Sequence, residues 1–177
     1  IAAPRNEAEL RNLLYTAQLG LELPIIIRYP RGRGVLKEWK IPFQKTEIGK
    51  AECLKEGTEI AVLSIGNMAE NVEKAIQELE KINREKIAHY DMKFVKPLDK
   101  KILNKILKKF SKIITVEDGV INGGFGSAIL EFASSTGYQG GLERLGIPDE
   151  FIEQGSVDEL QEIAKINVQG IQQKLES

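Results

Sequence analysis

Cysteine and histidine are scarce in this sequence, and their scarcity excludes several kinds of site. The chain has 177 residues, of which one is cysteine, Cys53, and one is histidine, His89. A single cysteine cannot form an internal disulfide, and its use fits a reducing compartment, so we expect a cytoplasmic protein. One histidine excludes a metal cluster built from histidines, and a catalytic triad would have to use this residue.

Long apolar runs and an excess of one charge are also absent. The longest apolar runs, such as 24–27 and 60–65, are far too short to span a bilayer. Charged residues make up 29% of the chain, yet the formal net charge is only -1, which argues against a general surface for nucleic acid or membranes. We therefore expect neither as a partner. The chain starts at Ile1, without a methionine or a signal sequence, and we interpret it as a fragment of a longer protein.

Beyond residue 47, apolar runs and amphipathic stretches alternate regularly. The pattern predicts strands at 48–54, 60–65, 87–94, 112–117 and 141–146. It predicts helices at 68–82, 97–110, 127–135, 158–166 and 169–175, with Asp99 as the cap of the second. Strands that alternate with helices indicate the α/β class, with a three-layer, mostly parallel five-stranded sheet covered on both faces.

The first 47 residues have a different organisation. A helix is expected at 4–19, capped by Asn6, and a strand at 24–29, where three consecutive isoleucines favour burial on both faces. The polar stretch that follows contains glycine, proline and alternating charges, and it is typical of a linker. We therefore divide the chain into a first unit at 1–35, a linker at 36–47 and a domain at 48–177.

Arg28 and Arg31 are the best candidates for an anion site. The expected strand ends in Arg28-Tyr29-Pro30-Arg31-Gly32, which projects two guanidinium groups from its carboxyl end, where open α/β sheets bind ligands. Arginine donates from a planar fork that matches phosphate or carboxylate. The alternative is a pair of interdomain salt bridges, and the residues alone favour neither interpretation.

A glycine-rich loop is expected at 118–126, between a strand and a helix, and it could hold a phosphate on free backbone N–H groups. It matches neither the dinucleotide fingerprint nor the P-loop. Glu117 and Asp118 would also repel an anion. We therefore favour a structural role, in which the glycines allow close packing of helix and strand.

Three further residues have structural interpretations that we prefer to functional ones. His89 could be oriented for catalysis by Asp91, two residues on, but no serine or cysteine lies in a nucleophile-elbow setting, so we expect a structural or surface histidine. Cys53 alternates with apolar neighbours, which predicts a buried thiol. Phe151 and Ile152 lie in a loop, and we expect them to form a contact within the fold or between subunits.

Several segments together resemble the C-terminal part of the 1-deoxy-D-xylulose-5-phosphate synthase family, which are thiamine-diphosphate enzymes of the transketolase type. These segments occur in the family's order and at matching spacing. They are Arg28-Tyr29-Pro30-Arg31-Gly32, Ile48-Gly49-Lys50, Met92-Lys93-Phe94-Val95-Lys96-Pro97-Leu98-Asp99, Thr115-Val116-Glu117-Asp118-Gly119, Gly123-Gly124-Phe125-Gly126-Ser127 and Gly146-Ile147-Pro148-Asp149.

The resemblance implies an enzyme that condenses pyruvate with D-glyceraldehyde 3-phosphate, releases carbon dioxide and supplies isoprenoid, thiamine and pyridoxal synthesis. The complete enzyme would be a homodimer that uses thiamine diphosphate and Mg²⁺. Residues 1–35 would be the tail of the pyrimidine-binding domain, and 48–177 the transketolase C-terminal domain. Arg31 matches the residue that binds the substrate phosphate, and Arg28 would support it.

The same resemblance implies that this chain lacks most of the active site. The Gly-Asp-Gly motif for metal and diphosphate, the glutamate that activates the cofactor and the active-site histidines belong to earlier segments of the family. We therefore expect no catalytic, cofactor-binding or metal-binding residue here, no bound cofactor and no activity of the chain alone. The alternatives are the C-terminal part of another transketolase-type enzyme, such as transketolase or a 2-oxoacid dehydrogenase β-subunit, and a non-catalytic α/β interaction domain.

Overall fold

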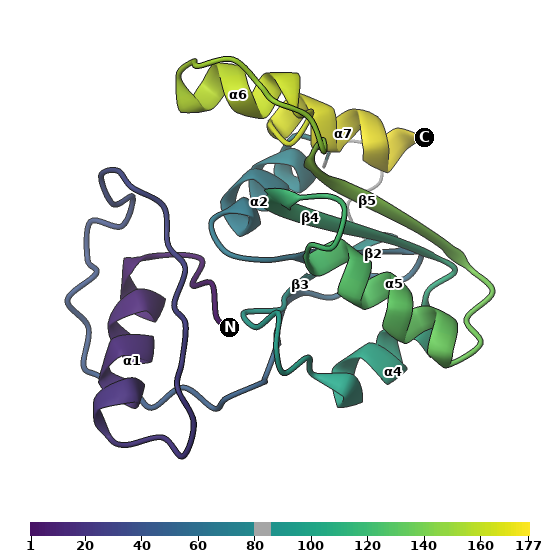
Figure 1. The fold of residues 1–177 in the computed structure, drawn as a ribbon. Coiled ribbons are helices and arrows are strands. Elements are labelled where there is room, and N and C mark those ends of the chain that lie inside the picture. Colours follow the sequence, from purple (N-terminus) through teal and green to yellow (C-terminus); the bar gives the residue numbers. More distant parts are fainter. Residues whose placement is uncertain (80–85) are drawn as a thin grey trace.

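A five-stranded sheet with helices on both faces forms most of the molecule, as the sequence predicts (Figure 1). The computed structural model describes residues 1–79 and 86–177. The strands are β1 (Glu52–Lys55), β2 (Ile60–Ser64), β3 (Ile87–Asp91), β4 (Lys112–Val120) and β5 (Gly141–Ile147), in the order β1-β3-β2-β4-β5. The edge strand β1 is antiparallel to β3, and the other pairs are parallel. The mostly parallel α/β fold is therefore confirmed.

Two layers of helices enclose this sheet and create two apolar cores. One face packs against α2 (Met68–Glu78) and α7 (Val168–Glu176), next to the short helix α6 (Val157–Ile163). The other face packs against α4 (Lys100–Lys109) and α5 (Phe125–Ser135). Of the helix expected at 68–82, residues 80–82 lie outside the described residues.

Local signals account for where the helices begin and where the strands are buried. The Asp99 carboxylate accepts hydrogen bonds from Lys101 N and Ile102 N, both at 3.1 Å, which confirms the expected cap of α4. The central strand β2 lies between two parallel neighbours, and its residues 61–64 are fully buried. Buried apolar strands of this kind are typical of parallel sheets covered on both faces.

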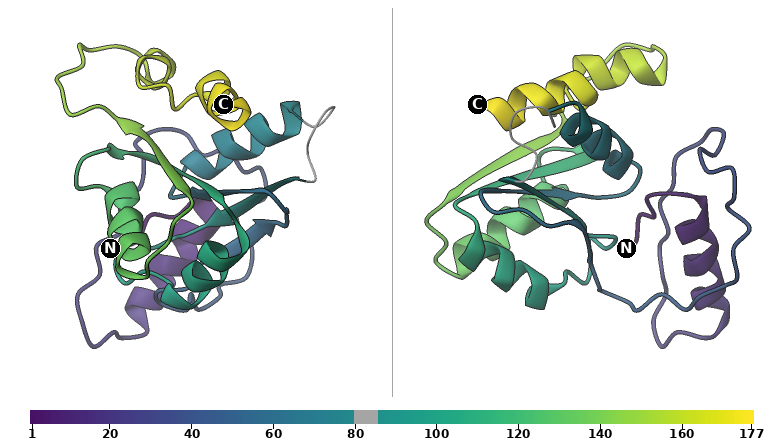
Figure 2. Two further views of the ribbon diagram at one scale, coloured as in Figure 1. Left: turned by 90° about the vertical axis from the view of Figure 1, so that its right-hand side faces the viewer. Right: turned by 180° about the vertical axis from the view of Figure 1, so that it is seen from behind.

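A smaller lobe formed by α1 (Glu7–Gln18) and an extended connector lies beside the sheet (Figure 2). Asn6 Oδ1 accepts a 3.0 Å hydrogen bond from Glu9 N, so Asn6 caps α1 as expected. The stretch at 36–47 runs along α1. Arg11 Nη1 donates to the carbonyls of Trp39 and Ile41, both at 2.9 Å. The expected linker is therefore held against the helix by directed contacts.

The strand expected at 24–29 is reduced to one isolated bridge, between Ile27 and Ala2. The expectation of burial on both faces is wrong, because the Ile26 side chain is 62% exposed. Ala2 also pairs with Phe94, so this one residue joins the isoleucine segment to the chain just beyond β3. Within the part of the chain that the structure describes, no helix combines the length and apolar character needed to span a membrane.

Candidate functional site

Arg28 lies above the carboxyl ends of two parallel strands. Its guanidinium forms an ion pair with Asp118, in the last part of β4. Its Nη2 atom also lies near Gly66, just after β2, where an added Cβ would be 3.8 Å away. The hydrogen bond that Arg28 donates to Asp118 raises the pKa of Arg28 further above its ordinary value. For Arg28, the salt-bridge interpretation is therefore the one that the geometry supports.

Arg31 has a different environment, although it is only three residues away. Its side chain is exposed, and it forms no hydrogen bond or ion pair with any residue that the structure describes. The two arginines therefore differ in environment. Arg28 forms an ion pair with Asp118, whereas the N–H donors of Arg31 face solvent. The assignment of Arg31 to a substrate phosphate stays a prediction.

The beginning of α5 is already occupied by a carboxylate of the protein. Phe125 N and Gly126 N donate to the two carboxylate oxygens of Glu117, each at 2.8 Å. Glu117 is buried, and burial raises its pKa above the ordinary value, while the two N–H donors oppose that change. These N–H groups are the ones that would hold a phosphate at a helix N-terminus, and they are satisfied internally.

The glycines in this loop allow close packing, which confirms the structural interpretation. β4 continues to Val120, so the loop is shorter than expected. A Cβ on Gly124 would lie 2.3 Å from both a Glu117 oxygen and the Val120 carbonyl oxygen. A Cβ on Gly126 would lie 2.5 Å from the Thr115 hydroxyl oxygen. A side chain at either position would separate α5 from β4.

His89 is a structural histidine, as the sequence favours. Its Nε2 atom shares a 2.8 Å hydrogen bond with Ser64 Oγ, and both side chains are buried. Burial lowers the pKa of His89 to about 3, so the ring is neutral at physiological pH. Asp91 forms no hydrogen bond with the ring; its Oδ1 accepts from Lys93 N at 3.2 Å. These three residues therefore do not form a catalytic triad.

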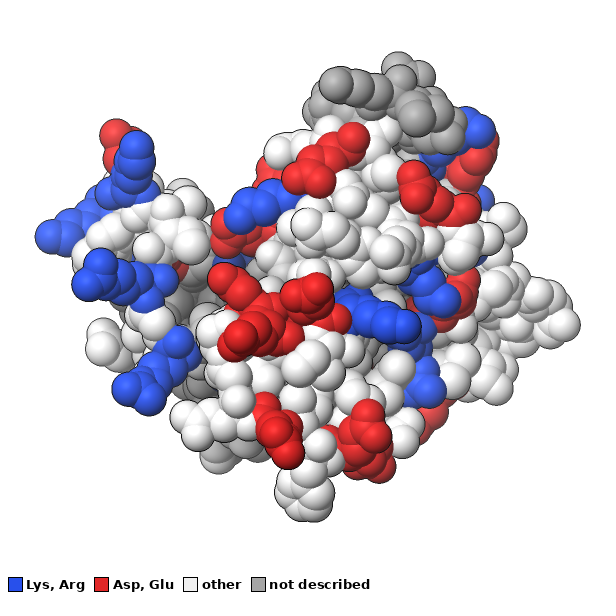
Figure 3. Space-filling view, turned by 90° about the horizontal axis from the view of Figure 1, so that it is seen from above, with Lys and Arg blue, Asp and Glu red and all other residues white. Residues whose placement is uncertain are grey.

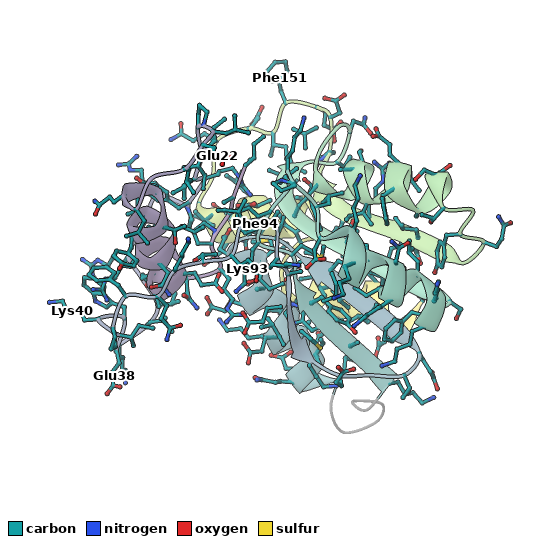
Figure 4. All side chains as sticks on the ribbon, turned by 90° about the horizontal axis from the view of Figure 1, so that it is seen from below. Glu22, Glu38, Lys40, Lys93, Phe94 and Phe151 are labelled. Atoms are coloured by element: carbon teal, nitrogen blue, oxygen red, sulfur yellow. The ribbon has the colours of Figure 1, made fainter. Side chains whose placement is uncertain are left out.

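A cluster of charged side chains, which the sequence did not reveal, joins the lobe to the sheet. The carboxylates of Glu9, Glu52 and Asp91 lie within 4.8 Å of one another. Lys93 Nζ lies 3.0 Å from Glu9 and 2.6 Å from Glu52, and Arg5 lies 3.6 Å from Asp91. Lys93 is labelled in Figure 4, between the lobe and the sheet. Burial, followed by the charge of Glu9, raises the pKa of Asp91 to about 7.

A cavity of about 590 Å³ lies next to this cluster, between the lobe and α2. Its wall is partly apolar, from Val35 and Leu36 of the connector, and partly charged, from Glu70 and Glu73 of α2. Figure 3 shows the hollow between the lobe, which carries Lys and Arg side chains, and the rest of the molecule. The lining residues are far apart in the sequence, so no local motif predicted this cavity.

Two predictions about single side chains require correction. Cys53 is exposed, because β1 is the edge strand of the sheet and Cys53 does not point into either core. Partial burial and the neighbouring Glu56 raise the pKa of this thiol. Phe151 is fully exposed, at 107% of its reference area, and points away from the fold (Figure 4). The expected contact within the fold is not formed by Phe151, and a subunit contact stays a prediction.

Comparison with known proteins places this geometry in one family. Residues 49–171 match the family model described as "Transketolase, C-terminal domain". The chain belongs to the transketolase C-terminal domain family. A solved structure described as "Split gene transketolase, inactive beta4 tetramer" is similar, with a TM-score of 0.83 and 26% identity over 99% of this chain and 55% of that one. Transketolase from Campylobacter jejuni shares the fold, with a TM-score of 0.51 and 19% identity over 72% of this chain and 18% of that one.

Curated relatives of this transketolase C-terminal domain include proteins named 1-deoxy-D-xylulose-5-phosphate synthase. The relative from Phocaeicola vulgatus is 51% identical over 171 residues, which are 97% of this chain and 27% of the relative. The relative from Parabacteroides distasonis is 49% identical over 175 residues, which are 99% of this chain and 28% of the relative. The chain therefore spans little more than a quarter of the length of these synthases.

Neither candidate place among the described residues fits a diphosphate group or a Mg²⁺ ion. A diphosphate would need free N–H groups at the start of α5, where Glu117 already accepts both bonds. Mg²⁺ prefers oxygen ligands at near-ideal octahedral geometry, but the carboxylates of Glu9, Glu52 and Asp91 already face the cations of Arg5 and Lys93.

Proposed function

We propose that this chain is the C-terminal part of a 1-deoxy-D-xylulose-5-phosphate synthase. The complete enzyme would be a thiamine-diphosphate transferase that joins pyruvate to D-glyceraldehyde 3-phosphate and releases carbon dioxide. The observation that carries the proposal is identity of 51% and 49% to two such synthases over nearly the whole chain. Identity to the transketolases of solved structure is only 26% and 19%.

In this proposal, Arg31 binds the phosphate group of D-glyceraldehyde 3-phosphate. A guanidinium offers parallel N–H donors that match phosphate geometry, and charge-assisted hydrogen bonds are among the strongest in proteins. The exposed side chain of Arg31 has no partner among the described residues that would compete with a phosphate. Binding energy at the remote phosphate would orient the aldehyde for reaction, which raises the rate through proximity.

The remaining parts of the active site would come from outside residues 1–177. Thiamine diphosphate and Mg²⁺ supply the covalent chemistry in this type of enzyme, and the protein supplies binding, orientation and electrostatics. The complete enzyme would be a cytoplasmic homodimer. Without those parts this chain would bind neither cofactor and would have no activity.

The experiment that tests the proposal is a substrate screen of the complete polypeptide that carries this chain, loaded with thiamine diphosphate and Mg²⁺. We expect 1-deoxy-D-xylulose 5-phosphate from pyruvate and D-glyceraldehyde 3-phosphate, and no transfer from ketose phosphate donors. The chain of 177 residues, assayed in parallel, should be inactive. Ketol transfer without use of pyruvate would favour a transketolase, and inactivity with every pair would favour an interaction domain.

A chimaera offers a second test of the same proposal. This chain would replace the matching 27% of the Phocaeicola vulgatus synthase, with which it shares 51% identity. The chimaera should make the same product from the same two substrates. The parent synthase carrying the split-gene transketolase segment, which is 26% identical to this chain, is the matched control and should not.

A further inference from the structure

The carboxyl ends of β2 and β4 form the place where an open parallel sheet ordinarily binds a ligand. In the order β1-β3-β2-β4-β5, the chain passes from β2 to β3 on one side and then crosses to β4 on the other. The strand order therefore reverses between β2 and β4. Ligands of such sheets bind in the crevice outside the carboxyl ends of the strands at this reversal.

In this protein, charged side chains of the chain itself lie at this position. Arg28 lies beside Gly66, at the end of β2, and pairs with Asp118, near the end of β4. The Glu117 carboxylate accepts hydrogen bonds from the backbone N–H groups at the start of α5, so these donors are not free to bind an anion. Arg28 thus stands where a small ligand would be expected.

Two kinds of contact hold the segment around Arg28: backbone hydrogen bonds at Ala2 hold its main chain, and the ion pair with Asp118 holds the Arg28 side chain. Arg28 N donates to Ala2 O, and Ala2 N donates to Ile26 O, both at 2.8 Å. Ala3 N donates to Lys93 O at 2.8 Å, which ties the same short segment to the chain after β3. Arg31 follows three residues later, and the ring of Pro30 between them restricts the backbone. A shift of Arg28 would therefore move Arg31.

We infer that the transketolase C-terminal domain positions Arg31 by holding Arg28 in this crevice, and that Asp118 is a positioning residue for the substrate phosphate. The inference rests on the proposed function, because it takes Arg31 as the phosphate-binding group. Asp118 does not touch the substrate in this arrangement. The side chains of Arg28 and Asp118 are 45% and 20% exposed, and such a pair adds little stability. The ion pair acts by positioning Arg31, because a small displacement of a group that binds the substrate lowers the reaction rate strongly.

The test is the preference of the complete enzyme for a phosphorylated acceptor. With pyruvate as the donor, kcat/KM is measured for D-glyceraldehyde 3-phosphate and for D-glyceraldehyde, which lacks the phosphate. We expect Asp118→Asn to lower the ratio of kcat/KM for D-glyceraldehyde 3-phosphate to kcat/KM for D-glyceraldehyde about tenfold. The ratio cancels the concentration of active enzyme, so a loss of folded protein alone does not change it.

Two further variants make the test decisive. Glu143→Gln is the matched control, because Glu143 forms ion pairs with Lys112 and Lys174, far from residues 1–47 in the fold, and it should keep the ratio of the wild type. The charge swap of Arg28→Asp with Asp118→Arg should restore most of the preference. The inference is overturned if Asp118→Asn has the same kcat/KM ratio as Glu143→Gln. It is also overturned if the charge-swap variant has a ratio as low as that of Asp118→Asn alone.

The failure of this inference can be told apart from failure of the proposed function. If Arg31→Ala lowers the phosphate preference and Asp118→Asn does not, the positioning role is wrong and the phosphate role of Arg31 stands. If Arg31→Ala leaves the preference unchanged, the proposed phosphate site itself is wrong. Amide exchange gives a readout besides activity: Asp118→Asn should speed exchange at Arg28 N, which donates to Ala2 O.

Discussion

The Oγ atom of Ser64 lies 2.8 Å from Nε2 of His89, and the two side chains belong to neighbouring parallel strands of the sheet. Both are buried, so protonation of the ring would place a charge in the interior. Asp91 lies two residues along β3 and is also buried, and burial acts on its charge in the same way. One strand therefore carries a base and an acid that each resist ionisation.

These two groups give opposite dependences of stability on pH. The pKa of His89 falls from 6.5 to about 3, so below pH 6.5 the unfolded chain binds a proton that the folded chain does not. Acid therefore removes the stability that His89 contributes. The pKa of Asp91 rises from 3.8 to about 7, so the folded chain binds the extra proton between those values. The stability linked to Asp91 is present in acid and is lost as the pH rises through about 7.

We predict that His89→Gln and Asp91→Asn will reveal slopes of opposite sign. Between about pH 6.5 and pH 4, the free energy of unfolding of His89→Gln should rise as the pH falls, by up to about 1.4 kcal/mol per pH unit. That of Asp91→Asn should fall at a similar rate, and the wild type should lie between them. Urea unfolding at a series of pH values measures all three.

The charged neighbours of Asp91 also affect its pKa. Arg5 and Lys93 favour the ionised form of Asp91, and Glu9 opposes it. Gln139→Ala replaces an exposed side chain that does not titrate, so this variant should keep the slope of the wild type over the same range. Parallel slopes for His89→Gln and Asp91→Asn would contradict the opposing roles of these two buried groups.

A second prediction concerns the close approach of α5 to β4. A Cβ on Gly124 would lie 2.3 Å from the Val120 carbonyl oxygen, which belongs to the backbone and cannot rotate away. We expect Gly124→Ala to lower the free energy of unfolding by about 2 kcal/mol, the usual cost of overpacking. Gly32→Ala is the control, because nothing lies within 4 Å of a Cβ there. Equal denaturation midpoints for the two variants would show that the loop can relax.

The sequence was sufficient to predict the elements of the sheet and its covering helices, because each carries local signals. The apolar run at 60–65 marks a buried strand, and Asp99 marks the start of a helix at the position where its carboxylate accepts two backbone bonds. The motif Arg28-Tyr29-Pro30-Arg31-Gly32 likewise pointed to charged chemistry. It could not show that the structure pairs Arg28 internally and leaves Arg31 exposed, since Asp118 is 90 residues away.

What could not be predicted depends on which segments meet in space. The three isoleucines at 25–27 suggested a buried strand, but burial requires neighbouring strands. Among residues 1–79 and 86–177, only Ala2 pairs with Ile27. The charged cluster combines Glu9, Glu52 and Asp91 from three separate segments, so no spacing in the sequence revealed it. Cys53 alternates with apolar residues as in a core strand, but strand order places it at the edge of the sheet.

The exposure of Cys53 leads to a third prediction. We expect this thiol to react completely with a disulfide reagent in the native protein, without denaturant. The reaction should be slower than that of the unfolded chain, because partial burial and Glu56 raise the pKa of the thiol. Glu56→Gln should accelerate labelling, since it removes a neighbouring negative charge. Labelling that occurs only after unfolding would restore the original prediction of a buried thiol.

The last prediction concerns Arg31, which has no hydrogen-bond or ion-pair partner among the described residues. In the complete enzyme, Arg31→Ala should raise the KM for D-glyceraldehyde 3-phosphate by about 10- to 100-fold, the range for a lost hydrogen bond to a charged group. The KM for pyruvate, which has no phosphate, should change little. Arg33→Ala is the matched control, because Arg33 is also exposed and forms no ion pair with the described residues. Steady-state kinetics with each substrate varied in turn measures both constants, and an equal change in the two constants for Arg31→Ala would exclude a phosphate-binding role.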